Sequence, residues 1–225
     1  MECVDICNRV FREISPSLFL YRMITDKQID LDINVLLDDY NYFELMYVTL
    51  IAWNMNMRKA KLVTFDSFRN SIISCKKEIV SLSSYELCKI KAEEIDSLLD
   101  MIEPLFKKIH VMQSKSKIVG VSKTLHFLLP KLIMPIDRTY TLKFMFGHMK
   151  YDNKPDKEYV TFKDVFKKFW AIVKNLSLNE DDLNGKLWNT TVPKLVDNAI
   201  IGFTKKQSGG VYRRWKAEVR SETRL

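Results

Sequence analysis

The 225-residue chain is long enough to bury one sizeable hydrophobic core, and 47% of its residues are hydrophobic, as in globular proteins. Six glycines and six prolines are too few for the many turns of a β-sandwich or a β-barrel. No apolar run reaches the roughly 18 residues that a membrane span needs, and Glu2 and Asp5 interrupt the basic start of a signal peptide. We therefore expect a cytoplasmic, mainly helical protein with no membrane association.

The net charge of +8 is distributed unevenly along the chain. Residues 1–104 carry 12 basic and 17 acidic side chains, a net charge of −5, whereas residues 105–225 carry 24 and 11, a net charge of +13. A basic half of this kind favours an anionic partner, of which nucleic acid is the commonest. The alternative is a solvated basic surface that keeps the protein in solution.

The four cysteines, at positions 3, 7, 75 and 88, contain no Cys-x-x-Cys pair. Cys3 and Cys7 can share one helix face, but a metal site there would need two more ligands, and the three histidines are far away in the sequence. We therefore expect reduced, buried or half-buried thiols, no metal site and no cofactor.

Apolar residues at helical spacing predict most of the elements in the first half of the chain. The expected helices cover residues 3–14, 42–57, 65–80, 84–101 and 105–111, and residues 15–40 are expected to be irregular. The helix over 42–57 is apolar on nearly all sides, which is typical of a central buried helix. Thr64 or Asp66 is the expected N-cap of the next helix, Ser84 caps the one after it, and Pro104 favours a new start.

The second half continues with helices expected over 121–129, 138–146, 162–176 and 192–203, and Asp137 stands at the N-cap of the second of them. Residues 1–203 then form one compact all-α domain of many helices, built as one lobe or as two. Residues 204–225 are polar and basic, which predicts a C-terminal tail or a short helix.

The segment from Ile118 to Ser122 has the composition of a tight turn between two helices. Such a turn exposes backbone N–H groups that suit phosphate. The residues predicted to bind nucleic acid are therefore Gly120, Val121, Ser122 and Thr124 at the turn, and Lys115, Lys117, Arg138, Arg213 and Arg214 as cations.

With Lys123 after this turn and the step Pro135-Ile136-Asp137 beyond it, about residues 102–147 resemble the helix-hairpin-helix DNA glycosylase superfamily. Its members are all-helical enzymes that remove damaged bases from DNA. In bifunctional members a lysine after the hairpin forms a Schiff base with the sugar, and an aspartate assists departure of the base. The resemblance implies that Lys123 and Asp137 are catalytic, that the helix-hairpin-helix-like element covers 102–129, and that DNA is a likelier partner than RNA.

The turn departs from the superfamily's pattern at three positions. Val119 replaces the usual proline, Ser122 replaces the second glycine, and Thr124 holds the usual position of the lysine. The one-residue offset rotates a helical side chain by about 100°. A monofunctional enzyme, or a fold retained without catalysis, therefore stays open.

A second resemblance covers about residues 40–150, which are similar to a family of uncharacterised prokaryotic proteins. It depends on Trp53-Asn54-Met55-Asn56, on Val119-Gly120-x-Ser122-Lys123, and on the stretch from Leu128 to Leu142. This similarity implies the boundaries of a shared region, but it implies no chemical reaction.

Each charged candidate also has a plainer interpretation. Lys123 is a nucleophile if burial lowers its pKa, and otherwise a phosphate-binding cation or a surface lysine. Asp137 caps the following helix, which does not exclude catalysis. Arg138 binds phosphate or pairs with a carboxylate. His126, on an apolar helix, is expected to be a hydrogen-bonded core residue rather than a catalyst.

The aromatic candidates are equally open. Trp53 and Tyr140 either stack on an everted base or belong to the core. The cluster 212–216 interleaves aromatic and cationic side chains, which suits single-stranded nucleic acid or a flexible terminal segment.

Three functions follow from these observations. The first is a glycosylase-like enzyme that acts on a base of DNA or RNA, the second a nucleic-acid-binding module without catalysis, and the third a scaffold whose basic face binds an acidic protein. The arrangement of Lys123 and Asp137 distinguishes them, because catalysis requires that both line one pocket large enough for a base.

Overall fold

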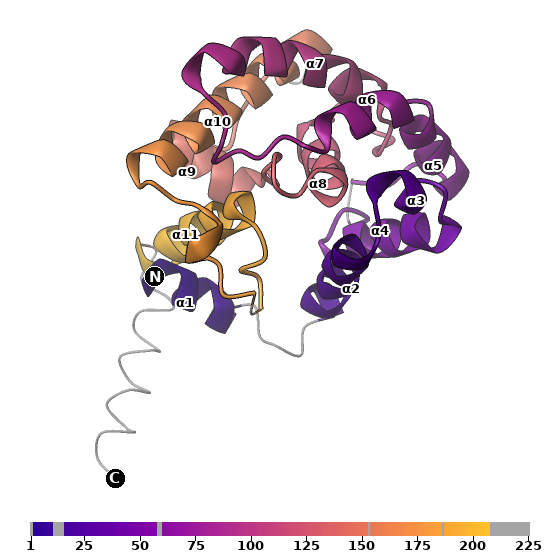
Figure 1. The fold of residues 1–225 in the computed structure, drawn as a ribbon. Helices are drawn as coiled ribbons and strands as arrows, with labels where there is room; N and C mark the ends of the chain where they lie inside the picture. The colour runs from indigo at the N-terminus through magenta and orange to yellow at the C-terminus, as the bar shows by residue number, and fades with distance from the viewer. Residues whose placement is uncertain (1, 11–15, 58–59, 153, 186, 208–225) are drawn as a thin grey trace.

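The computed structural model describes residues 2–10, 16–57, 60–152, 154–185 and 187–207, and they confirm the expected all-α fold of many helices (Figure 1). Within these residues there is no β-strand, and Leu62 and Met112 form an isolated β-bridge. The elements are α1 (Glu2–Val10), α2 (Pro16–Asp30), α3 (Ile33–Leu36), α4 (Tyr40–Ala52), α5 (Phe65–Ile73), α6 (Lys76–Leu82), η1 (Ala92–Glu94), α7 (Ile95–Lys108), α8 (Ile118–Leu128), η2 (Arg138–Leu142), α9 (Lys143–Phe146), α10 (Pro155–Asn175), η3 (Glu180–Asp182) and α11 (Val192–Gln207). No helix in the described part of the chain combines the length and apolar composition of a membrane span.

The central helix of the fold is α8. All of its residues except Val119 are buried, and it packs against α4, α7 and α10. The sequence analysis assigned this central place to the helix over 42–57, which was wrong. That helix is α4, and it exposes Val48 and Ile51 to solvent while it buries Tyr42, Phe43 and Met46.

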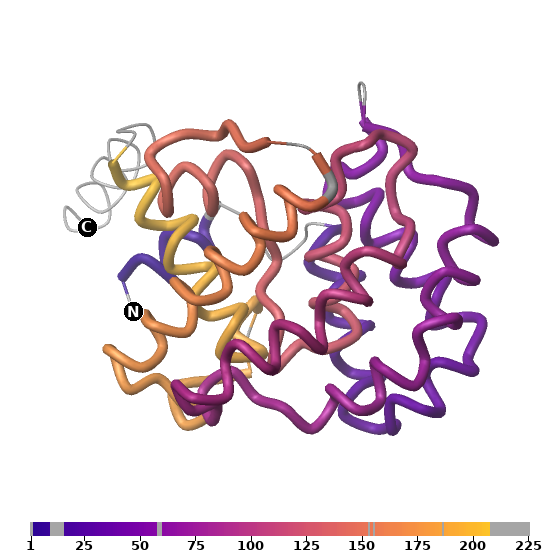
Figure 2. Tube along the Cα trace, turned by 90° about the horizontal axis from the view of Figure 1, so that it is seen from above, coloured from indigo at the N-terminus to yellow at the C-terminus, as the bar shows by residue number. Residues whose placement is uncertain are grey.

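The helices lie on two sides of α8, as the view from above shows (Figure 2). One side consists of α2 to α6, drawn in indigo and purple, and the other consists of α9 to α11, drawn in orange and yellow. The N-terminal helix α1 joins the second side, because it packs along α11. The two sides therefore meet around one buried helix.

The contact between α1 and α11 is very close. A Cβ atom built on Gly202 would lie 1.7 Å from the backbone oxygen of Cys3, so only glycine fits at that position of α11. This approach holds the N-terminal helix, and with it Cys7, against the C-terminal half of the molecule.

Two expectations for the N-terminal half were wrong. Residues 16–30 are not irregular but form α2, whose buried face consists of Leu18, Tyr21, Ile24 and Thr25 at helical spacing. The first turn of a helix accepts Pro16, which needs no N–H donor there. The helix over 65–80 is broken into α5 and α6 at Ser74 and Cys75, although Thr64 does cap α5 by accepting a hydrogen bond from Ser67 N.

The predictions of a helix over 84–101 and of a new helix after Pro104 were also wrong. Helix α7 runs from Ile95 to Lys108 and contains Pro104. Pro104 forfeits one hydrogen bond within this helix. The preceding segment is held in a non-helical path by tertiary hydrogen bonds, in which Leu87 N donates to Lys131 O at 2.9 Å and Trp170 Nε1 donates to Ile90 O at 3.0 Å. Contacts distant in the sequence thus override the helical spacing.

Candidate active site

The turn predicted at residues 118–122 is wrong, because these residues form the first turn of α8. The connection between α7 and α8 is the segment 109–117 instead. The four residues predicted to present amides to phosphate are all buried: Gly120, Val121, Ser122 and Thr124. A Cβ atom on Gly120 would lie 2.9 Å from Met112 Cγ, so this glycine allows close packing inside the protein rather than an approach to a ligand.

The N-terminus of α8 already has an anionic partner within the protein. The Glu158 carboxylate, on α10, is fully buried and accepts hydrogen bonds from Lys117 N at 3.0 Å with Oε1 and at 2.8 Å with Oε2. Burial raises the pKa of Glu158, and the backbone hydrogen bond from Lys117 opposes that rise. Since a helix N-terminus favours negative charge, Glu158 takes the place that the sequence analysis gave to phosphate.

The predicted cations lie on the surface near this end of the molecule. Lys115 is exposed, Lys117 donates from Nζ to Lys107 O at 3.0 Å, and Arg138 is exposed. The Arg138 guanidinium lies 5.3 Å from the centre of the Tyr151 ring, and its Nε donates to Met149 O at 3.3 Å. Arg213 and Arg214 lie outside the described residues.

The two residues that the resemblance implies to be catalytic do lie together. Lys123 and Asp137 line one pocket of about 390 Å³, which is within the usual size range of small-molecule sites. Three aromatic side chains, Trp53, Tyr140 and Trp188, share its wall. The pocket is formed by α1, the end of α4, α8, the segment before η2, and α11.

The wall next to Lys123 is the C-terminal end of α4. Asn54 ends this helix with φ of 63°, in the left-handed region that Asn tolerates, and Met55 N donates back to Leu50 O at 2.9 Å. This turn places Trp53 O 3.4 Å and Met55 Sδ 3.6 Å from Lys123 Nζ. The hydrogen bond to the carbonyl is long, and a thioether is a weak acceptor, so both interactions with the Lys123 amine are weak.

Lys123 is buried, with 7% of its surface exposed. Within the described part of the chain, no carboxylate oxygen lies within 4 Å of its Nζ atom. Desolvation lowers the pKa of Lys123, and attraction to Asp137 and then Asp197 opposes this effect. A buried amine with such partners gives up its proton more readily than a surface lysine.

Asp137 is held in a fixed orientation at the N-cap of η2, as the sequence predicted. Its Oδ1 atom accepts hydrogen bonds from Thr139 N at 2.7 Å and Tyr140 N at 3.1 Å, and its own N donates to Thr141 Oγ1 at 3.0 Å. The buried Ser122 hydroxyl accepts a hydrogen bond from Ile136 N at 3.0 Å. Helix α8 therefore fixes the segment that carries the carboxylate.

A second lysine–aspartate pair, on α11, completes the charges of the pocket. Lys194 Nζ lies 2.5 Å from Asp197 Oδ2, and both side chains are almost fully buried. Burial raises the pKa of Asp197, and Lys194 opposes that rise. The pocket thus contains two lysines and two aspartates, so its basic and acidic side chains are equal in number.

His126 confirms the expectation of a hydrogen-bonded core histidine. Its Nδ1 atom lies 2.7 Å from Ile133 O, which can only accept, so Nδ1 carries the proton and Nε2 accepts from Tyr21 Oη at 3.1 Å. Thr190 Oγ1, 2.7 Å from Tyr21 Oη, is the donor to it. The chain from Thr190 to Ile133 is therefore made of neutral groups, and burial lowers the pKa of His126 to about 3.

This buried histidine predicts a loss of stability in acid. The unfolded chain binds a proton on His126 below about pH 6.5, whereas the folded chain excludes it down to about pH 3. The free energy of unfolding should therefore fall as pH decreases through this window, by an amount on the order of 4 kcal/mol. Urea unfolding between pH 7 and pH 4 measures the slope.

His126→Asn keeps the hydrogen bond to Ile133 O and should flatten this slope while it lowers stability at pH 7. The matched control is His110→Asn, because His110 is exposed and its loss should leave the slope unchanged. Equal slopes for the parent protein and the His126 variant would contradict the neutral-core assignment.

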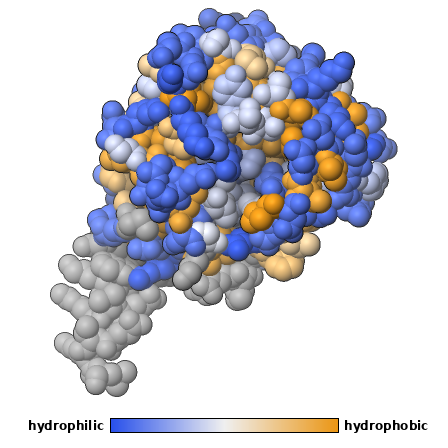
Figure 3. Space-filling view, viewed as in Figure 1, coloured by the Kyte–Doolittle hydropathy of each residue, from blue (hydrophilic) through white to orange (hydrophobic). Residues whose placement is uncertain are grey.

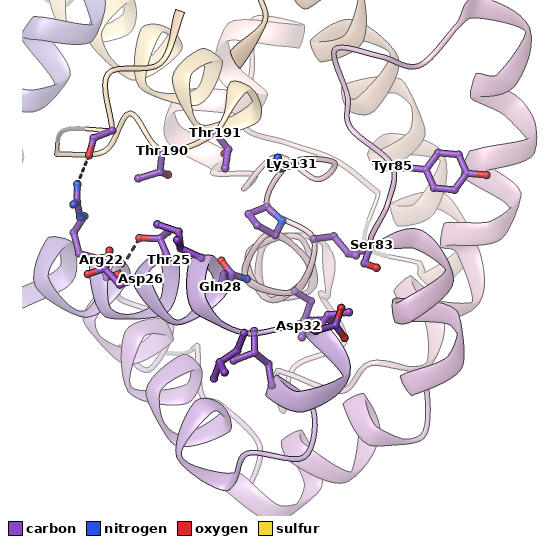
Figure 4. Close-up of a pocket in the computed structure, with 18 residues that line it drawn as sticks. Arg22, Thr25, Asp26, Gln28, Asp32, Ser83, Tyr85, Lys131, Thr190 and Thr191 are labelled. Carbon is purple, nitrogen blue, oxygen red and sulfur yellow. Dashed lines mark hydrogen bonds between the residues drawn. The ribbon is translucent and has the colours of Figure 1, made fainter. Parts of the chain in front are cut away.

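A second pocket, of about 410 Å³, opens beside the C-terminal end of α8 (Figure 4). Thr190 and Thr191 lie on one side of it, and Thr25 and Gln28 of α2 lie on the other. Gln28 Nε2 donates to Tyr42 Oη at 3.0 Å, and Lys131 is paired with Glu180 at 2.7 Å. Because Gln28 and Lys131 are engaged with these partners, this pocket offers less chemistry than the one at Lys123.

Sequence reasoning missed Lys194, Asp197 and Trp188. The pattern Lys-x-x-Asp at the start of a helix is typical of a solvent-exposed ion pair, and nothing local marks it as buried. Val192 and Val196 on the same helix are also buried, so α11 is apolar around the pair. Apolar neighbours in the sequence indicate that α11 has a buried face, but they do not place the pair on that face, so the sequence held no sufficient signal.

The described residues contain no group of three or more side chains that could hold a metal ion, and the four cysteines are free. The chain matches no protein-family model, and neither a curated protein nor a solved structure is significantly similar to it.

Proposed function

We propose that this chain is a base-excising enzyme of nucleic acid, with a pocket that accepts an everted nucleobase and with Lys123 and Asp137 acting on the sugar. The observation that carries the proposal is their common pocket, because an amine and a carboxylate 14 positions apart in sequence line the same aromatic cavity. Enzymes that act on a base must bind it outside the helical stack.

The proposed nucleophile is the neutral amine of Lys123. Its nitrogen attacks C1′ of the sugar, the C1′–N bond breaks, and the base leaves with the bonding electron pair and takes up a proton. Lys123 releases one proton in the same exchange, and opening of the sugar ring then gives an imine between Lys123 and C1′. Desolvation of the amine supports this role because only the neutral form has a free electron pair.

Asp137 is proposed to stabilise positive charge on the sugar as the base departs. Its two backbone donors, from Thr139 and Tyr140, keep one carboxylate oxygen in place before substrate arrives. A preorganised negative charge beside a developing cation lowers the barrier without further reorganisation.

The aromatic side chains supply the proposed base-binding surface. Trp53, Tyr140 and Trp188 line the pocket and give it aromatic surface that a planar base can contact. The Trp53 Nε1–H group is buried and has no acceptor among the described residues. Lys205 lies 5.4 Å from the centre of the Tyr140 ring, which brings one cation of the basic half to the pocket.

The backbone of the nucleic acid would have to bind to side-chain cations, because Glu158 occupies the N-terminus of α8. Hydrophilic side chains cover most of the face drawn in Figure 3, and hydrophobic groups interrupt them in patches. Binding by exposed lysines and arginines such as Lys115 and Arg138 should weaken steeply with added salt.

Trapping with borohydride tests the proposal. The full chain is incubated with duplex and single-stranded DNA that contain uracil, 8-oxoguanine, hypoxanthine or an alkylated purine, and sodium borohydride reduces any imine. We expect base release from at least one substrate and a covalent adduct that peptide mass spectrometry locates at Lys123. Asp137→Asn should lower base release by about 100-fold or more, because charge stabilisation is lost.

The outcomes separate the alternatives. Base release without an adduct would indicate a monofunctional enzyme that depends on Asp137. Salt-dependent binding without base release would indicate a nucleic-acid-binding module. The absence of both binding and base release across the substrates would contradict the proposal.

A further inference from the structure

We propose that Lys194 is a positioning residue for Lys123. By holding Asp197 in an ion pair, Lys194 denies Lys123 a carboxylate partner and so keeps the Lys123 amine neutral. This inference rests on the proposed role of Lys123 as the nucleophile, but its test requires no nucleic acid.

The first observation is that both lysines approach the same indole ring. Lys123 Nζ lies 5.6 Å from the centre of the Trp53 ring, and Lys194 Nζ lies 5.4 Å from it. The two amines come from different helices, α8 and α11, and meet in one buried pocket. Two ammonium groups at one site repel each other, so the less stabilised of them loses its proton first.

The second observation is that the two lysines have unequal partners. Lys194 has the Asp197 carboxylate at 2.5 Å and also faces the Trp188 ring at 5.1 Å and the Tyr21 ring at 6.0 Å. Lys123 has a carbonyl at 3.4 Å and a thioether at 3.6 Å. The ion pair and the three aromatic faces therefore hold the positive charge on Lys194.

The other titratable groups that line the pocket do not determine the protonation of Lys123 in the same way. Asp137 attracts a proton to Lys123, but one of its oxygens is bound by two backbone amides of η2. Cys7, on α1, also lines the pocket, and its burial raises its pKa to about 12, so it remains a neutral thiol. The remaining titratable group there is the Tyr140 phenol. Lys194 therefore determines whether Asp197 can form an ion pair with Lys123.

The consequence of removing Lys194 follows from this arrangement. Without it, Asp197 would be a buried carboxylate with no counter-ion, and the nearest amine in the pocket is Lys123. Protonation of Lys123 would then restore a neutral pair. Lys194 therefore competes with Lys123 for one carboxylate, and its success leaves Lys123 reactive.

Competitive acetylation measures this effect directly. The full-length parent protein and its variants are treated with trace acetic anhydride between pH 6 and pH 11, and mass spectrometry compares Lys123 with exposed lysines of the same molecule. Lys194→Met should lower the labelling of Lys123 at pH 8 by about tenfold or more, which corresponds to a rise of at least one unit in its pKa. Lys194→Arg keeps the charge and should label Lys123 within about twofold of the parent protein.

Asp197→Asn keeps the test decisive if Lys194→Met does not fold, as circular dichroism would show. This change removes the competing carboxylate and leaves Lys194 charged, so Lys123 labelling at pH 8 should rise or stay equal. Unchanged labelling in a folded Lys194→Met variant, or a decrease in Asp197→Asn, would overturn the inference. Because no nucleic acid is present, absence of base release would contradict the proposed function and leave this result standing.

Discussion

Lys123→Met is expected to abolish the borohydride adduct and to lower base release by about 1,000-fold, while it raises the free energy of unfolding. The loss follows from removal of the only amine that the proposal places on C1′. The gain in stability follows from burial, because a methionine of similar volume needs no hydrogen bond where Lys123 now has only weak acceptors. We expect a gain of about 1–3 kcal/mol, the usual cost of a poorly paired buried polar group.

The opposite signs of these two effects make the prediction specific. Base release is measured on the substrate that gives the trapped adduct, and stability by urea unfolding. Lys77→Met is the matched control, since Lys77 is exposed, has no proposed role and should change neither the adduct nor the stability by more than about 0.5 kcal/mol. Full activity in Lys123→Met would show that the amine is not a nucleophile.

Gly202→Ala is expected to destabilise the protein strongly. The new Cβ atom would lie 1.7 Å from Cys3 O and 2.6 Å from Cys3 C, which are backbone atoms of α1 and cannot rotate away. Helix α1 must therefore move off α11. We expect a loss of about 3 kcal/mol or more in the free energy of unfolding, at the upper end of the range for overpacked cores.

Gly120→Ala provides the matched comparison, because Gly120 is also a glycine within a helix. Its new Cβ would meet side-chain atoms of Met112 at 2.9 and 3.1 Å, and methionine can change its conformation. The gain in helix propensity of about 1 kcal/mol should offset much of the strain. Thiol labelling gives a second measurement, since displacement of α1 should expose Cys7 in the Gly202 variant alone. Similar stabilities of the two variants would contradict the backbone contact between α1 and α11.

The sequence located the helical elements best where the pattern was strongly periodic or capped by a local side chain. Asp137 at the N-cap of η2, Thr64 at the N-cap of α5, and α11 are examples. It failed where an element depended on distant residues. The path of residues 83–91 is set by Lys131 and Trp170, and the N-terminus of α8 is occupied by Glu158, 41 positions from Lys117.

The residues of the candidate site also fall into those that the sequence identified and those that only the structure revealed. Lys123 and Asp137 were identified by their short motifs, and the structure places them in one pocket. The anion-binding turn was an interpretation of local composition, which cannot show that these residues are buried in α8 or that a carboxylate from α10 already binds the Lys117 amide at its N-terminus. Lys194 and Asp197 carry no local mark of burial, so only the packing of α11 against α1 and η2 reveals them as part of the pocket.

By itself, the sequence determined that the chain is all-helical, that its net positive charge lies in residues 105–225, and that a lysine in an apolar helix is followed by a capping aspartate. Composition, period and capping act over a few residues, so they can be read locally. The tertiary structure alone decided which groups are accessible and which are paired. It buries α8, fills its N-terminus with Glu158, and gives Asp197 to Lys194 rather than to Lys123. The physical reason is that burial and ion pairing depend on residues brought together from distant parts of the chain, and these set the pKa of an amine far more than its neighbours in sequence.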